Sequence, residues 1–149
     1  MRTIDWDDDR ECVVMVDQTR LPAEYTTYHA ETVDDLVESI EILRVRGAPA
    51  LGAAGAFGVA LAAQTTDADS LDAFREAIQA DADRVATARP TAVNLSRGVD
   101  EALAAMDDAE SVADARQSTL RAAKDLADRD VERNRAIGEH GATLLSDGD

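Results

Sequence analysis

The stretch RGAPALGAAGAFG, residues 46–58, runs from a single arginine into a predicted helix made almost wholly of Ala and Gly. The apolar composition continues to residue 63, which is short of the roughly 20 residues that a membrane-spanning helix needs. We therefore expect a buried core helix over residues 49–64. Each of its glycines destabilises a helix by about 0.5–1 kcal/mol relative to Ala, so they need a packing or ligand reason. These glycines are Gly52, Gly55 and Gly58.

The start of this helix has the chemistry of an anion site. Gly47 lets the backbone approach a ligand closely, and the first helical turn offers unpaired N–H groups and the positive end of the helix dipole. Pro49 is accepted there because its missing N–H needs no partner. Arg46 adds a guanidinium suited to phosphate oxygens. A structural Arg46, bound to helix-end carbonyls or to a carboxylate, is the alternative.

A second arginine stands at a second predicted helix start. Arg89 precedes Pro90, which favours an extended backbone just ahead of the helix. Taken alone, Arg89 reads as an ordinary surface residue of an acidic protein. Together with Arg46 it predicts a pocket for a phosphorylated metabolite.

Over the whole chain, we expect one domain at residues 1–149, which is β-rich in residues 1–30 and helical in residues 31–145. Runs at 11–17 and 24–30 rich in Val, Thr and Tyr predict strands, with Ile4 and Trp6 as apolar anchors before a turn. Apolar residues at helical spacing predict about five helices. They cover about residues 32–46, 49–64, 70–87, 91 onward and 111–140. The fold class is mostly α within α+β: a short antiparallel hairpin or sheet followed by a helical bundle.

The chain is strongly acidic, with 31 Asp and Glu against 15 Lys and Arg and a formal net charge of −16. Nucleic-acid-binding proteins usually carry a basic footprint, so a nucleic-acid partner is not expected. The acidic residues are spread along the chain and are mostly Asp, a pattern typical of adaptation to a salty cytoplasm. A local acidic docking surface is the alternative. With no apolar N-terminal run, the sequence predicts a cytoplasmic protein with no membrane partner.

The remaining reactive residue types favour structural roles. Cys12 is the only cysteine and lies in a predicted strand, so we expect a small buried apolar side chain. His29 and His140 have no Cys, carboxylate or second His at a ligating spacing, so no metal site is expected. Asp17-Gln18-Thr19 suits a turn or a polar cluster at a sheet edge.

Three further polar residues carry less information. Arg44 is two positions before Arg46, and residues two apart on a helix do not share a face. We therefore expect Arg44 to be solvated or ion-paired and not to join Arg46 in the anion site. Asn134 and Arg135 lie late in the last helix and suit a pocket, solvent or an intersubunit contact. No nucleophile–base pair is apparent, so the sequence predicts an anion site without its own catalytic machinery.

Several segments resemble the N-terminal part of the methylthioribose-1-phosphate isomerases, a family of the methionine salvage pathway. They are MRTIDW (1–6), VDQTRLPAEY (16–25), RGAPALGAAGAFGVALAA (46–63), RPTAVNLSRGVDEAL (89–103) and ERNRAIGEHGATLL (132–145). Their order and spacing agree along the whole chain. The wider superfamily includes ribose-1,5-bisphosphate isomerases and the regulatory subunits of eukaryotic initiation factor two B.

The resemblance implies an aldose–ketose isomerisation of 5-methylthioribose 1-phosphate to 5-methylthioribulose 1-phosphate without a required cofactor. The family's substrate-binding Arg-Gly-Ala matches Arg46, Gly47 and Ala48, and a further substrate-binding arginine matches Arg89. These are positions that the helix-start argument also selects.

The resemblance also implies that catalytic groups lie elsewhere. Family members are about twice this length, and their catalytic Cys and Asp belong to a C-terminal Rossmann-like domain with no counterpart here. Cys12 does not match the catalytic Cys. We therefore expect an N-terminal part that is inactive alone and is completed by a second half or subunit, commonly as a homo-oligomer. A ribose-1,5-bisphosphate isomerase half and a non-catalytic regulatory module are the alternatives.

Overall fold

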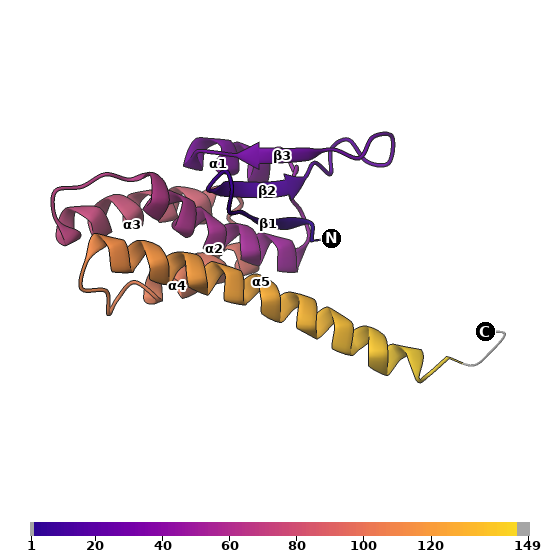
Figure 1. Ribbon diagram of the computed structural model, residues 1–149. Coiled ribbons are helices and arrows are strands. Elements are labelled where there is room, and N and C mark those ends of the chain that lie inside the picture. Colours follow the sequence, from indigo (N-terminus) through magenta and orange to yellow (C-terminus); the bar gives the residue numbers. More distant parts are fainter. Residues whose placement is uncertain (1, 146–149) are drawn as a thin grey trace.

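The computed structural model describes residues 2–145 and consists of a small sheet followed by five helices (Figure 1). The strands are β1 (Ile4–Asp7), β2 (Cys12–Val16) and β3 (Thr27–Ala30). The helices are α1 (Val33–Glu41), α2 (Ala48–Thr65), α3 (Leu71–Thr87), α4 (Val93–Ala104) and α5 (Val112–Ala142). The predicted fold class, an antiparallel sheet followed by a helical bundle, is confirmed.

The three strands form one antiparallel sheet in the order β1-β2-β3. Ile4 and Trp6 are buried and belong to a full strand, where the sequence suggested only two apolar anchors. Trp6 pairs with Val13 across the sheet and stacks on Phe57 of α2, with ring centroids 6.4 Å apart. The apolar face of the sheet therefore packs directly on the central helix.

Helix α2 is the centre of the fold, as its composition predicts. Every residue from Leu51 to Ala63 is buried, and the other elements surround it (Figure 1). The 18-residue helix α2 is longer than the apolar stretch predicted from the sequence, and by length and composition alone it could cross a membrane. However, 72% of it is buried inside the fold. Its apolar composition is therefore explained by its neighbours within this domain.

Glycines allow α2 and α4 to touch backbone to backbone. A Cβ added at Gly55 would lie 2.3 Å from the carbonyl oxygen of Leu95, and one added at Gly98 would lie 1.9 Å from the carbonyl oxygen of Gly52. A Cβ at Gly58 would meet the side chains of Val85 and Leu36 at 3.0–3.1 Å. Close packing therefore explains why these helices contain glycine, although glycine destabilises a helix.

The first helix is shorter than predicted. Thr32 caps it, in a capping box completed by Asp35. However, α1 ends at Glu41, although the sequence predicts a helix to about residue 46. Leu43 lies beyond the helix at φ 68, with 40% of its surface exposed. The N–H groups of Arg44 and Val45 turn back to the carbonyl of Ser39 and close the helix end. Residues 42–47 are consequently a loop that leads into α2.

Helix α4 begins two residues later than the predicted position, Thr91. Ala92 donates its N–H to the carbonyl of Arg89 at 2.9 Å, so Arg89–Ala92 form a turn in front of the helix. Helix α5 begins as predicted after Ser111, whose hydroxyl caps it, and its C-terminal half projects beyond the rest of the fold (Figure 1).

Candidate functional site

All four residues predicted to bind substrate line one pocket of about 600 Å³. The pocket lies between the loop before α2, the first turn of α2 and the turn that leads into α4. Its lining residues are Leu43, Arg46, Gly47, Ala48, Leu51, Arg89, Thr91, Ala92, Val93 and Asn94. The structure thus brings together Arg46 and Arg89, which are far apart in the sequence.

The start of α2 is open toward this pocket. Gly47 is the N-cap, with φ 100 and ψ 134, a conformation that residues with a Cβ rarely adopt. A Cβ built at Gly47 would have no described atom within 4 Å, so the space in front of it is clear. With Pro49 in the second helical position, Ala48 and Ala50 carry the N–H groups of the first turn.

Side-chain caps distinguish the two helices at the pocket from the other three. Thr32, Ser70 and Ser111 each accept a hydrogen bond from the first turn of α1, α3 and α5. Within the described residues, no side chain caps α2 or α4. An uncapped helix start leaves N–H donors for a ligand, and the helix dipole favours an anion there.

The two arginines of the pocket are not neutralised by carboxylates of the described residues. The arginines that form ion pairs in this part of the chain are Arg2, Arg20, Arg44, Arg84, Arg116 and Arg129. Arg46 is exposed, and its Nε donates to Oε1 of Gln18 at 3.4 Å. This partner is neither a helix-end carbonyl nor a carboxylate, the two structural roles that the sequence left open for Arg46. Arg89 is partly buried in the turn before α4.

Arg44 has a different role from Arg46, as predicted. Its guanidinium lies 4.1 Å from the ring centroid of Tyr28 and is 3.7 Å from carboxylate oxygens of Asp17 and of Glu38. Asp17 in turn accepts hydrogen bonds from the hydroxyl and the N–H of Thr19 at 2.6 and 3.0 Å. The hydroxyl bond of Thr19 holds the pKa of the Asp17 carboxyl below its ordinary value against the effect of burial, and Arg44 adds to the lowering. Asp17 therefore stays charged and fixes Arg44.

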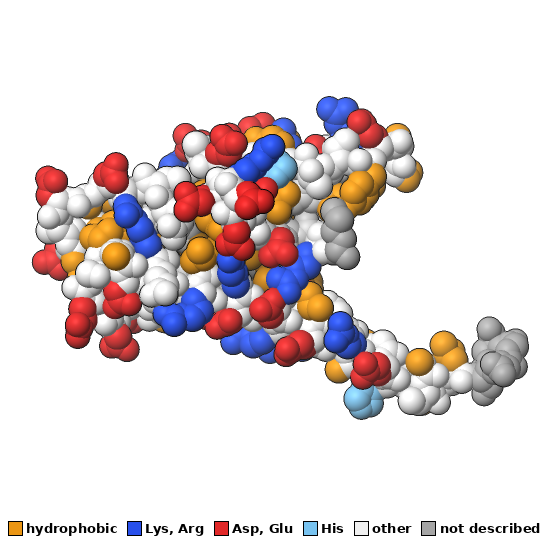
Figure 2. Space-filling model, viewed as in Figure 1, with side chains coloured by type: hydrophobic (Ala, Val, Ile, Leu, Met, Phe, Trp, Pro, Cys, Tyr) orange, Lys and Arg blue, Asp and Glu red, His pale blue; other side chains and the backbone are white. Residues whose placement is uncertain are grey.

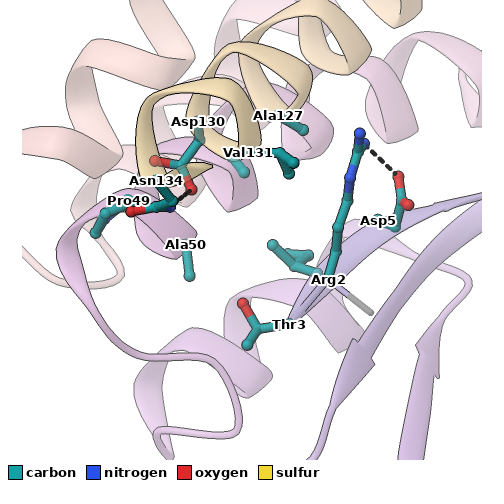
Figure 3. Close-up of a pocket in the computed structure, with 11 residues that line it drawn as sticks. Arg2, Thr3, Asp5, Pro49, Ala50, Ala127, Asp130, Val131 and Asn134 are labelled. Carbon is teal, nitrogen blue, oxygen red and sulfur yellow. Dashed lines mark hydrogen bonds and ion pairs between the residues drawn. The ribbon is translucent and has the colours of Figure 1, made fainter. Parts of the chain in front are cut away.

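A second pocket, of about 640 Å³, lies between β1, the start of α2 and α5 (Figure 3). Arg2 is bound to Asp5 there, and the side chain of Asn134 donates to Asp130 at 3.2 Å. Asn134 therefore faces a pocket, one of the three placements that the sequence allowed. In Figure 2 a recess separates the sheet side of the molecule from the projecting end of α5.

Cys12 and the histidines are placed as structural residues. Cys12 is 1% exposed, and burial raises the pKa of its thiol above the ordinary value, which disfavours the reactive thiolate. His29 does have a carboxylate neighbour that its sequence spacing did not reveal, because Asp7 of β1 lies 3.2 Å from its Nε2. In the described part of the chain, no three His, Cys, Asp or Glu side chains form a group that could hold a metal ion.

Sequence reasoning missed the part that Gln18 takes in the site. Gln18 belongs to the turn after β2, and its side chain contacts both the guanidinium and the backbone of Arg46. Only the polar composition of residues 17–19 hinted at a role for this turn. The contact between Gln18 and Arg46 forms only when the loop before α2 folds back on the sheet. A local sequence pattern does not predict such a long-range contact.

Comparison with known proteins agrees with this architecture. The chain is 40% identical to the methylthioribose-1-phosphate isomerase of Geobacillus kaustophilus, over 99% of this chain and 41% of the relative. The crystal structure of a protein named translation initiation factor eIF-2B, subunit delta, from A. fulgidus superposes with a TM-score of 0.93 at 46% identity, over 100% of this chain and 43% of that one.

A second solved structure, 5-methylthioribose 1-phosphate isomerase from Pyrococcus horikoshii OT3, gives a TM-score of 0.91 at 32% identity. It is matched over 99% of this chain and 41% of its own. This chain therefore spans less than half the length of the relatives it matches. Residues 44–149 match the model of the initiation factor 2 subunit family. With most of its length matched by that model, the chain belongs to the initiation factor 2 subunit family.

Proposed function

We propose that this chain supplies the phosphate-binding part of an isomerase that acts on 5-methylthioribose 1-phosphate. The observation that carries the proposal is the single pocket that joins Arg46, Gly47 and Ala48 to Arg89. The names of two relatives, from Geobacillus kaustophilus and Pyrococcus horikoshii, support this substrate over the bisphosphate alternative.

The chemistry of the pocket suits a phosphate monoester. The N–H groups of Ala48 and Ala50 are the first free donors of α2, since the first helical bond runs from Leu51 to the carbonyl of Gly47 at 2.9 Å. Gly47 has no side chain to obstruct them. Arg46 and Arg89 contribute two positive charges from two directions. Backbone donors and guanidinium groups together bind phosphate more strongly than either does alone.

Sugar-phosphate isomerisation also needs groups that move protons or hydride, and the resemblance assigns these to a second domain. We place that domain against the pocket between β1, α2 and α5, next to the projecting end of α5. Large apolar side chains are exposed on this end, namely Ile137, Leu144 and Leu145, with 69%, 83% and 71% of their surface accessible. A domain docked there would bury these three side chains beside the start of α2.

A regulatory module without sugar-phosphate affinity is a second candidate, and the observation in its favour is the similarity to the A. fulgidus protein that is named as an eIF-2B subunit. The two candidates differ in a measurable property. An isomerase part binds 5-methylthioribose 1-phosphate, and a regulatory module of this kind has no need of it.

Replacement of the pocket arginines tests the proposal. We expect Arg46→Ala and Arg89→Ala each to weaken binding of 5-methylthioribose 1-phosphate by about 10- to 100-fold, since each removes a charged donor to phosphate. Titration calorimetry on the 149-residue chain measures the affinity. Arg121→Ala is the matched control, because Arg121 is exposed on α5 outside the pocket and should leave binding unchanged. Equal affinity of the unmodified chain and the three variants for 5-methylthioribose 1-phosphate would refute the site.

We further propose that the acidic surface adapts the protein to a salty cytoplasm. Acidic side chains are spread over the visible face of the molecule (Figure 2), and the net charge of −16 makes the fold repel itself at low salt. Raising KCl from about 0.1 M to about 2 M shortens the Debye length to a few ångströms. We expect the melting temperature to rise by at least about 5 °C.

Sucrose of equal osmolality is the control for the salt effect, because it stabilises by exclusion without screening charge. A melting temperature that responds to sucrose as it does to KCl would remove the electrostatic explanation. A cooperatively folded monomer at low salt whose stability does not change with KCl would argue for a local acidic docking surface instead.

A further inference from the structure

We infer that Gln18 is a positioning residue for the anion site, and that it acts by fixing the guanidinium of Arg46. The inference rests on the proposed function and extends it to a residue outside the pocket lining. Gln18 is in the turn after β2, 28 positions before Arg46 in the sequence.

Two hydrogen bonds join the side chain of Gln18 to Arg46. Nε of Arg46 donates to Oε1 of Gln18 at 3.4 Å, and Nε2 of Gln18 donates to the carbonyl oxygen of Arg46 at 3.3 Å. One amide thus holds both the side chain and the backbone of the same residue. Among uncharged side chains, only Asn and Gln present a carbonyl acceptor and an amide donor in this form.

The geometry leaves the ligand-binding end of Arg46 available. Gln18 accepts from Nε, so the two terminal Nη groups keep their donors for two of the oxygens of a phosphate. An exposed arginine without such a contact samples many rotamers, and ordering it on binding costs side-chain entropy. Because the bond to Gln18 already restricts the Arg46 side chain in the folded protein, part of this entropy is lost on folding. Less of it is then lost when the ligand binds.

Gln18 is itself held on its backbone side. Its N–H donates to the carbonyl of Arg44 at 3.0 Å. The neighbouring carboxylate of Asp17 is fixed by Thr19 and ion-pairs with Arg44 at 3.7 Å. The turn after β2 is therefore tied to the loop before α2 at Arg44 and at Arg46. This loop delivers Gly47 to the start of α2, so the turn orients the whole anion-binding end.

The test replaces Gln18 by Met, which keeps the length of the side chain and removes both hydrogen bonds. We expect Gln18→Met to weaken binding of 5-methylthioribose 1-phosphate to the 149-residue chain by about 3- to 10-fold, which corresponds to the net contribution of about one hydrogen bond. Gln79→Met is the control, because Gln79 is exposed on α3 and its side chain bonds to Asp83. It should not change the affinity.

A double-mutant cycle separates positioning from direct contact. If Gln18 acts through Arg46, Gln18→Met has no further effect on affinity in the Arg46→Ala background. An equal loss in both backgrounds overturns the inference, and so does an unchanged affinity of Gln18→Met when Arg46→Ala weakens binding. If Arg46→Ala does not weaken binding, it is the proposed site that fails.

A measurement on the unmodified chain covers the case in which Gln18→Met does not fold. The Nε–H of Arg46 should exchange with solvent more slowly than that of Arg121 in ¹⁵N NMR spectra, because it is hydrogen-bonded. Equal exchange rates at the two arginines overturn the inference.

Discussion

Gly98→Ala is expected to destabilise the fold by at least about 3 kcal/mol, the upper part of the range for overpacked cores. The added methyl group would lie 1.9 Å from the carbonyl oxygen and 2.8 Å from the carbonyl carbon of Gly52, and 3.2 Å from the nitrogen of Ala56. All three atoms belong to the backbone of α2, so no rotamer change relieves the contact. Because α2 is also packed against the sheet and α5, it has no free direction in which to move.

Urea denaturation measures this effect as a lower midpoint at an unchanged slope. Gly138→Ala is the matched control. Gly138 also lies inside a helix, but a Cβ there has no described atom within 4 Å. Removal of an exposed helical glycine should leave stability unchanged or raise it by up to about 1 kcal/mol. A Gly98→Ala protein as stable as Gly138→Ala would show that α2 and α4 do not pack as described.

The elements that could be predicted from the sequence are those encoded by local patterns. Thr32, Ser70 and Ser111 stand one residue before the helices they cap, and the apolar run of α2 gives both its place and its burial. The end of α1 could not be predicted in this way. Leu43 continues the helical apolar pattern, but the backbone of Arg44 and Val45 turns back to Ser39 instead. In this loop Arg44 contacts Asp17, which follows β2, and Tyr28 of β3, and both residues are distant in sequence.

The same distinction applies to the pocket. Arg46 and Gly47 could be selected from the chemistry of one helix start, and Arg89 from another, because each lies beside the turn that opens its helix. That both line one pocket follows from the close contact of α2 with α4, which depends on Gly98 as well as on the glycines of α2. Gln18 could not be found from the sequence, since its contact with Arg46 exists only after the sheet and the loop before α2 come together.

Turnover of 5-methylthioribose 1-phosphate should be absent from the 149-residue chain alone. A single positioned acid or base accelerates a reaction by about 10²–10⁴-fold, and the resemblance assigns the whole catalytic set to a second domain. Cys12 offers no substitute, because it is buried and its thiol has a raised pKa. We expect a rate below about 10⁻⁴ of that of the Geobacillus kaustophilus relative, measured as formation of the ketose by NMR.

Addition of the second domain tests the same idea in the opposite direction. We expect a fusion of residues 1–149 to the remaining part of the Geobacillus kaustophilus isomerase, which is 40% identical over the matched region, to recover turnover. Arg46→Ala in the fusion should abolish most of it, and Arg121→Ala should not. Appreciable isomerisation by the 149-residue chain alone would place catalytic groups within these residues. A well-folded fusion that neither binds the sugar phosphate nor turns it over would instead favour the regulatory role, because a module of that kind needs no affinity for the sugar phosphate.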